Sequence, residues 1–470
     1  MSARSKKKTV LPALIIATAA LLITATILFI IFPTAKIQDT KRLTENTYNS
    51  LFISMYSIEN YSEENFKEFR GLDTIVTTHT ARNANELVAY LDLAFQSDNI
   101  IDTVYIGLDP YILYKSGATS EVAMAAELAD LFEYIISYPD VTFEILLPAP
   151  RIDYWTGLNP EQSESATLAY RHAISCFEPH TNAICFFSGN EKWLIMNPNN
   201  YTGKITTNAL ISQKILLSSF CDRKFVINVS NADMLLNELR SIIATESTSP
   251  AEYPDLSDKT IVFFGDSILG LDYGSYSIPG VINGLTGADF YNYAIGGTTG
   301  CDADTTTDAD HSFTDQMNKL ISHADFYTGD HTQFPYDKVA DDNLVFVINY
   351  GFNDYLHGYA TEEFYQALEA EIALLKKEYP GAQIIIMVPH GNVYADAGVA
   401  DPNKKGIFLS EYADIVRQLA KEQNLTLLDV PSIVVVDETT HSDYFKDGCH
   451  YNEQGRFQLA QHIISVIECN

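Results

Sequence analysis

The sequence predicts an α/β fold with mostly parallel sheets. The first observation is a series of short apolar runs in the second half of the chain, at residues 261–264, 344–348, 384–388 and 425–430. Runs that are apolar at nearly every position are typical of strands covered on both faces, and such strands belong to parallel sheets. The second observation is a helical pattern between two of these runs, which is the alternation expected of α/β domains.

The clearest helical pattern occupies residues 361–379. Phe364, Leu368 and Ile372 recur there at helical spacing, with glutamates in the first turn and lysines in the last. Those charges suit the helix dipole, and the Pro-Gly pair that follows ends the pattern. A final helix is expected after Asn452, which can cap it. Strands alternating with helices predict a three-layer α/β/α sandwich with right-handed crossovers.

The chain before residue 245 repeats this rhythm, so we predict a second α/β domain there. Strands are expected at residues 103–106, 142–147, 183–187 and 225–229. The first three begin 39 and 41 residues apart, and the runs at 344, 384 and 425 begin 40 and 41 residues apart. The match has two interpretations, a degenerate duplication or the general periodicity of α/β folds.

The N-terminus has the pattern of an uncleaved membrane anchor. Four basic residues among the first eight precede an uncharged run from Thr9 to Ala35. A bilayer core is crossed by about 20 apolar residues, whereas a cleavable signal usually has an apolar region of roughly 7–15. The basic residues are expected to stay in the cytoplasm, which places the rest of the chain outside. The alternative is a long signal peptide cleaved near residues 33–35.

The 470 residues suit two domains after such an anchor. A polar stretch with two prolines separates the domains and is predicted to be a linker. The expected parts are a basic tail at 1–9, a transmembrane anchor at 10–35, a first α/β domain at 36–244, the linker at 245–258 and a second domain at 259–470.

Charge and cysteine content exclude several functional classes. The net charge of −31 disfavours nucleic-acid binding by repulsion. The six cysteines include no CxxC pair, so neither a zinc site nor a disulfide scaffold is predicted. Cys301 and Cys449 form the one pair worth testing for a disulfide, although buried free thiols are favoured. The acidic loop at 302–310 lacks the glycine of an EF-hand, and a solvated loop is preferred over an irregular calcium site.

Four segments of the second domain carry residues suited to acyl transfer. Residues 264–267 read Phe-Gly-Asp-Ser, 292–297 read Asn-Tyr-Ala-Ile-Gly-Gly, 351–354 read Gly-Phe-Asn-Asp and 447–450 read Asp-Gly-Cys-His. A serine hydroxyl needs a base, a group that orients the base, and donors for the oxyanion. Ser267 directly follows a predicted buried strand, which places it at the carboxyl edge of the sheet, where open α/β folds bind ligands.

We expect His450 to be the base and Asp447 to orient it by accepting the Nδ1 proton. The expected oxyanion donors are the Ser267 backbone N–H, a backbone N–H of the 296–297 turn, and the Asn353 amide. His441 is a rival base, because it also has an acidic residue three positions earlier. Each segment alone has a structural explanation as a helix cap or a turn. Their joint occurrence favours the catalytic interpretation.

The four segments resemble those of the SGNH (GDSL-like) hydrolases, over residues 259–470. The resemblance implies a flavodoxin-like sandwich with Ser267 as nucleophile, and with Asp447 and His450 completing the triad. It also implies Asn353 and one glycine as oxyanion donors; Gly297 aligns best, and Gly296 is the alternative. The name GDSL stands for Gly-Asp-Ser-Leu, whereas this chain reads Gly-Asp-Ser-Ile, with isoleucine at position 268.

These observations predict a membrane-anchored serine esterase with its catalytic domain outside the cell. The expected substrate is a small acyl ester, above all an acetyl ester on envelope or extracellular carbohydrate. No cofactor, metal or nucleic-acid partner is expected. Two alternatives stay open: an O-acyltransferase that uses the same triad on envelope polysaccharide, and a non-catalytic envelope protein that binds or assembles other components.

Overall fold

The structure is a computed structural model that describes residues 36–248, 251–272, 274–302, 312–324, 340–394 and 397–467. The predicted anchor at 10–35 and the acidic residues 303–310 lie outside these ranges. Among the described residues, no helix has the length and apolar character needed to cross a membrane. Contacts divide the chain into two compact units: one comprises residues up to 150, 154–190 and 203–241, and the other 151–153, 191–202 and 242–470.

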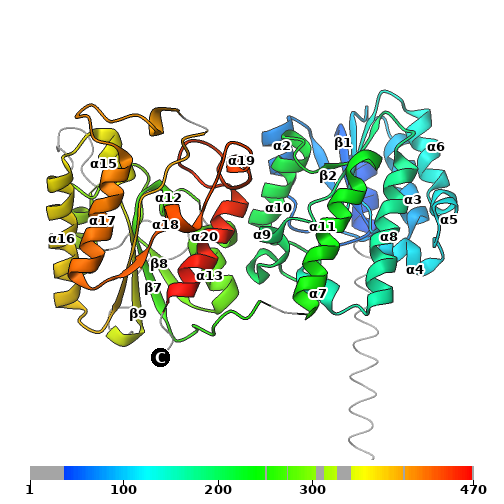
Figure 1. The fold of residues 1–470 in the computed structure, drawn as a ribbon. Coiled ribbons are helices and arrows are strands. Elements are labelled where there is room, and N and C mark those ends of the chain that lie inside the picture. Colours follow the sequence, from blue (N-terminus) through cyan, green and yellow to red (C-terminus); the bar gives the residue numbers. More distant parts are fainter. Residues whose placement is uncertain are drawn as a thin grey trace, which may run out of the picture. The chain divides into compact units, whose positions relative to one another are not determined.

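Five parallel strands form the sheet of the second unit (Figure 1). They are β7 (Thr260–Gly265), β8 (Asp289–Asn292), β9 (Leu344–Asn349), β10 (Gln383–Met387) and β11 (Thr426–Leu428). Their order in the sheet is β11-β10-β9-β7-β8. Every residue of β7 and β9 is buried, as the apolar runs predict. Gly265 pairs with Asn349, so these two strands end side by side at the carboxyl edge.

Helices cover both faces of this sheet (Figure 1). One face carries α13 (Ile278–Thr286) and α20 (Glu453–Val466), and the other carries α14 (Phe313–Ile321), α16 (Thr361–Glu378) and α17 (Leu409–Gln423). The shorter helices and turns are α12 (Ser267–Gly270), η3 (Gly274–Tyr276), η4 (Asp341–Asn343), α15 (Phe352–His357), η5 (Ala397–Val399), α18 (Val430–Ile433) and α19 (His441–Tyr444). As predicted, α16 follows the 361–379 pattern, and Asn452 caps α20 by accepting from the Gly455 N–H.

The first unit has a six-stranded sheet in the order β2-β1-β3-β4-β5-β6. Its strands are β1 (Ser50–Ser54), β2 (Thr74–Val76), β3 (Thr103–Gly107), β4 (Thr142–Leu146), β5 (Ala183–Phe186) and β6 (Val226–Ile227). The first five are parallel, and β6 is antiparallel to β5. The order of those five strands is the order found in the second unit. The strands with matching spacing, β3 to β5 and β9 to β11, therefore hold equivalent places, while duplication itself stays a prediction.

Besides the helical residues 36–45, ten labelled helices lie in the first half of the chain. They are α2 (Glu63–Arg70), α3 (Ala84–Phe95), α4 (Pro110–Ser116), α5 (Glu121–Glu127), α6 (Ala129–Ser137), α7 (Ile152–Thr156), α8 (Pro160–Phe177), α9 (Lys192–Ile195), α10 (Ala209–Leu216) and α11 (Val229–Thr248), with the turns η1 (Pro198–Asn200) and η2 (Leu217–Cys221). The last of them, α11, continues to Thr248, within the stretch predicted as linker.

Residues 191–202 precede the predicted linker in the chain but group with the second unit. Asn197 is fully buried, and its amide donates to the Ser275 carbonyl at 2.6 Å. Gly284 of α13 passes so closely that a Cβ there would lie 1.9 Å from the Asn197 side-chain oxygen. The second unit therefore includes a segment from the first half of the chain.

Candidate active site

The serine of the first segment stands at the first position of a short helix that follows β7. Asp266 is the N-cap residue of α12, and its carboxylate accepts from the Ile268 N–H at 2.9 Å. The capping explanation considered for the serine therefore applies to Asp266, and the Ser267 hydroxyl is left for another partner. Gly270 of α12 allows a close approach, since a Cβ there would lie 2.4 Å from the Ala294 carbonyl oxygen.

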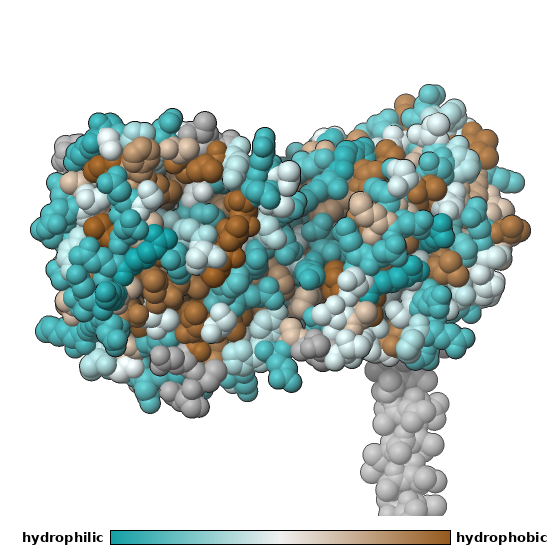
Figure 2. Space-filling view, in the orientation of Figure 1, coloured by the Kyte–Doolittle hydropathy of each residue, from teal (hydrophilic) through white to brown (hydrophobic). Residues whose placement is uncertain are grey.

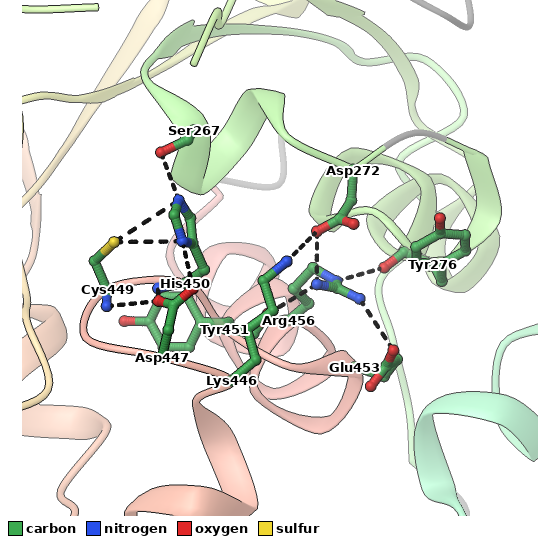
Figure 3. A network of polar contacts seen from close by, with 10 residues as sticks. All are labelled: Ser267, Asp272, Tyr276, Lys446, Asp447, Cys449, His450, Tyr451, Glu453 and Arg456. Carbon is green, nitrogen blue, oxygen red and sulfur yellow. Dashed lines mark hydrogen bonds and ion pairs between the residues drawn. The ribbon is translucent and has the colours of Figure 1, made fainter. Parts of the chain in front are cut away.

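His450 provides that partner. Its Nε2 lies 2.9 Å from Ser267 Oγ, and its Nδ1 lies 2.8 Å from Asp447 Oδ2 (Figure 3). These residues are far apart in the sequence, since Ser267 follows the first strand of the second unit, β7, and Asp447 and His450 precede its last helix, α20. A serine, a histidine and an aspartate in this order of contacts have the arrangement of a catalytic triad.

The Asp447 carboxylate is held in its ionised form by its own loop. Burial alone would raise the pKa of Asp447, but hydrogen bonds from the backbone N–H groups of Cys449 and His450, together with the His450 ring, outweigh it and lower the pKa to about 2. The two backbone bonds measure 2.9 and 2.7 Å. Asp447 is thus positioned to accept from the imidazole Nδ1 over the whole neutral pH range.

The rival base, His441, lies elsewhere. Its ring stacks on Tyr394, with ring centroids 5.9 Å apart, and its Nδ1 lies 3.3 Å from the Asn392 side-chain amide. Asn392 also contacts the loop of residues 447–450, by donating to the carbonyls of Gly448 and Asp447. His441 therefore packs behind this loop, while His450 contacts the serine.

The glycine turn lies next to the serine. A Cβ built on Gly296 would lie 3.7 Å from the Ser267 Cβ, and Gly297 has a φ of 84°. That φ lies in the left-handed region, which favours glycine. The structure therefore places Gly296 against Ser267 and gives Gly297 the conformation that forms the turn. Both remain candidates for the donor.

Asn353 is the second residue of α15, which follows β9. Its side-chain amide donates to Asp266 Oδ2 at 3.1 Å and to the Thr298 carbonyl at 3.0 Å. Both amide hydrogens are therefore engaged, so donation to an oxyanion requires release of one of these bonds. The contacts tie Asn353 to the serine segment and to the glycine turn.

The sequence profile of the GDSL-like Lipase/Acylhydrolase family matches residues 263–456. This part of the chain belongs to that family. The match spans the serine, the glycine turn, Asn353 and the Asp447–His450 pair. No curated protein matches the chain.

Several solved structures are similar to the GDSL-like domain. A member of the lipolytic protein G-D-S-L family from Veillonella parvula is 18% identical, with a TM-score of 0.34, covering 44% of this chain and 98% of that one. A carbohydrate acetylesterase family member from Sinorhizobium meliloti is 19% identical, with a TM-score of 0.33, over 44% and 96%. A lipase/acylhydrolase from Enterococcus faecalis is 19% identical, with a TM-score of 0.30, over 44% and 94%.

Two buried carboxyl groups that the sequence reasoning missed organise the GDSL-like site. Burial raises the pKa of Asp266 to about 7, and the nearby Asp354 carboxyl adds to the effect. Asp354 is fully buried and accepts from the backbone N–H groups of Gly300, Cys301 and Gly351 at 2.9, 2.9 and 3.1 Å. Burial nevertheless raises the pKa of Asp354. Asp354 therefore joins the residues after the glycine turn to the start of α15.

Arg456 of α20 anchors the backbone beside the loop of residues 447–450 (Figure 3). Its guanidinium is buried and donates to Asp272 at 2.6 Å, to the Tyr451 carbonyl at 2.8 Å and to the Tyr276 carbonyl at 3.1 Å. Tyr451 directly follows His450, so the ion pair anchors the backbone next to the base. This contact set links the loop before α20 to the loop after α12.

A hollow of about 370 Å³ lies among residues of the 389–431 stretch, after β10 and around the start of α17. Its lining is mostly apolar and includes Pro389, His390, Val393, Val399, Phe408 and Leu409. His390 lies 3.1 Å from the Tyr451 hydroxyl, which connects the hollow to the residue after the base. An apolar hollow of this size can hold an apolar group of a ligand.

The five cysteines among the described residues are not in disulfides. Cys176, Cys185, Cys221, Cys301 and Cys449 form no disulfide in the described part of the chain. The pair singled out for testing is therefore not bridged here. Cys301 is buried next to Asp354, whereas Cys449 lies beside the His450 ring, with Sγ 3.4 Å from Nδ1.

Proposed function

We propose that this protein is a serine esterase that hydrolyses acyl esters, with acetyl esters of envelope or extracellular carbohydrate as its substrates. The observation that supports it most directly is the contact of His450 Nε2 with Ser267 Oγ at 2.9 Å, backed by the Asp447 contact at Nδ1. A hydroxyl in this position can lose its proton to the imidazole as it attacks an ester carbonyl.

The proposed reaction has two steps. Ser267 Oγ bonds to the carbonyl carbon, its proton passes to His450 Nε2, and the same proton is then given to the leaving alcohol as the ester bond breaks. Water next attacks the acyl-serine with His450 again as base, which releases the acid and restores the serine. The oxyanion of each step would be stabilised by the Ser267 and glycine-turn N–H groups and by Asn353.

The proposed location comes from the sequence. The basic residues 1–9 and the apolar run 10–35 support a single-pass anchor with the catalytic domain outside the cell. An esterase held there meets acylated polymers of the envelope or its surroundings. This position is the basis for the proposed substrate class.

Acetate release tests this proposal. The purified full chain is incubated with p-nitrophenyl acetate and with an acetylated polysaccharide, with and without a free sugar acceptor, alongside Ser267→Ala. We expect free acetate from wild type in both reactions and none above background from the variant. Acetyl-sugar formed in preference to acetate would replace the hydrolase by a transferase. Equal acetate release by Ser267→Ala would contradict catalysis by Ser267.

The acyl group is tested by a series of p-nitrophenyl esters from acetyl to octanoyl. An acetyl preference gives the highest kcat/KM at the shortest chain. A kcat/KM that rises with acyl chain length would contradict the acetyl preference. If replacing Val399 with a larger side chain also lowers kcat/KM for the long esters, the acyl group binds in the hollow.

A further inference from the structure

The loop that carries the base also carries a thiol that the proposed reaction does not use. Cys449 Sγ lies 3.4 Å from His450 Nδ1 and 3.7 Å from Nε2, while Asp447 Oδ2 lies 2.8 Å from the same Nδ1 (Figure 3). One donor atom from each of Asp447, Cys449 and His450 lies within 4.8 Å of the other two. A sulfur, a nitrogen and an oxygen donor therefore converge beside the nucleophile.

These three donors are of the types that bind a tetrahedral metal ion, and they are close enough to reach one after small side-chain movements. Zinc bonds sulfur at about 2.3 Å and imidazole nitrogen at about 2.0–2.1 Å, which puts the two donors about 3.5 Å apart at a tetrahedral angle. The observed distance between Cys449 Sγ and His450 Nδ1 is 3.4 Å, but Sγ also lies 3.7 Å from Nε2 and therefore over the face of the ring, so the Cys449 side chain has to turn towards the Nδ1 lone pair to share an ion with it. Nitrogen and oxygen donors on zinc lie about 3.4 Å apart by the same geometry, so Asp447 would have to move back by about half an ångström.

The loop is also open to an incoming ion. The Asp447 side chain is 46% exposed and that of His450 is 25% exposed. A thiolate and a carboxylate balance the charge of a divalent cation, and a solvent molecule can supply the fourth ligand from the exposed side. The combination of sulfur and imidazole selects zinc-like ions over magnesium, which prefers oxygen ligands.

We propose that Asp447, Cys449 and His450 form a site for a thiophilic divalent cation such as Zn²⁺, and that its occupancy switches off Ser267. Binding uses the lone pair of His450 Nδ1, so the single proton of the neutral ring moves to Nε2. Nε2 then presents an N–H to Ser267 Oγ and has no lone pair to accept the serine proton. The Cys449 thiol releases one proton to solvent, and no electron transfer is involved.

The inhibitory part of this inference rests on the proposed serine chemistry, but the metal site itself does not. Two readouts separate them. Co²⁺ added to the purified full chain reports the site by thiolate-to-metal charge-transfer absorption, without any substrate. The rate of Ser267 labelling by a fluorophosphonate probe reports the nucleophile, in buffered free Zn²⁺ with EDTA reversal and with Mg²⁺ as the hard-ion comparison.

We expect Co²⁺ absorption that Cys449→Ala abolishes, and labelling that Zn²⁺ slows and EDTA restores. Each protein is compared with its own metal-free rate, and the half-inhibiting Zn²⁺ concentration should rise roughly tenfold or more in Cys449→Ala and Cys449→Ser. Cys221→Ser, a partly buried cysteine of the first unit, is the control and should behave as wild type.

Three outcomes would overturn the inference. Equal zinc sensitivity in wild type and both Cys449 variants would exclude the thiol as a ligand. Absence of cobalt absorption in wild type would exclude the site. Cobalt absorption that depends on Cys449, with labelling unaffected by Zn²⁺, would contradict the switch. Absence of labelling in metal-free wild type would count against the proposed function, and the cobalt arm would still decide the site.

Discussion

Asp266 is a buried acid at the centre of the site, and its protonation affects stability. Its pKa is raised from 3.8 to about 7 by burial and by the nearby Asp354. The folded protein therefore binds this proton more tightly than the unfolded chain does. The contribution to stability is present in full below about pH 4, falls as the pH rises towards 7, and stays lost above that value.

Replacing Asp266 with asparagine removes this pH dependence, because the amide is neutral at every pH and can still cap Ile268. We expect Asp266→Asn to unfold on the order of a few degrees higher than wild type at pH 8, with the difference shrinking towards pH 4.5. Calorimetric scans of both proteins across this range measure it. A constant difference at all pH values would show that Asp266 does not change its protonation in this window.

Asn353 is the residue whose proposed role depends most on movement, because both its amide hydrogens are already bonded to Asp266 and Thr298. If one of them turns to the oxyanion, Asn353→Ala should lower kcat roughly 10²–10³-fold with little change in KM. Asn403→Ala, which removes an amide bonded to Tyr412, is the control. Activity of Asn353→Ala within twofold of wild type would remove Asn353 from the oxyanion site.

At the scale of elements, residues 191–202 show that the second unit does not coincide with one stretch of chain. Asn197 lies in this segment, and its buried amide bonds to Ser275 of the second unit. Losing a buried hydrogen bond of this kind costs about 1–3 kcal/mol. We expect Asn197→Ala to lower the unfolding temperature of the second unit, measured by calorimetry.

Asn190→Ala serves as the comparison for that variant. Asn190 belongs to the first unit, and its amide bonds to the exposed Glu238 side chain. The Asn190→Ala substitution should leave the unfolding temperature of the second unit unchanged. If both substitutions change the unfolding temperature by the same small amount, Asn197 contributes no stability to the second unit.

The elements that the sequence predicted are the ones with a strong local pattern. The apolar runs predicted β7, β9, β10 and β11, and helical spacing predicted α16. β8 reads Asp-Phe-Tyr-Asn, too short and mixed for a strand pattern, and β1 and β2 were not predicted either. The run at 225–229 predicted β6, which is only two residues long. The four segments with candidate catalytic residues were expected to meet, because open α/β folds bind their ligands at the carboxyl edge of the sheet.

No local sequence pattern predicts the contacts that hold the site together. Asp266 and Asp354 both lie inside segments that the sequence singled out, but their partners are 87 and 54 residues away in the chain. The same holds for Arg456 and Asp272. Such pairs follow from the tertiary fold, so their roles became visible only in three dimensions.

At the scale of the whole molecule, two units with the same order of five parallel strands occur in one chain, and the triad lies in the second. The proposed anchor precedes both units. We expect the full chain to sediment with membranes and a chain beginning at Lys36 to remain in the supernatant, measured by fractionation with immunodetection. Both proteins in the supernatant would contradict the anchor.

The central claim is that Ser267 is an activated nucleophile. Its most direct test is covalent labelling of the purified full chain by a fluorophosphonate probe, with the modified residue located by mass spectrometry. We expect one adduct on Ser267, its absence in Ser267→Ala, and strongly reduced labelling in His450→Ala. No adduct on wild type, or equal labelling of Ser267→Ala, would contradict it.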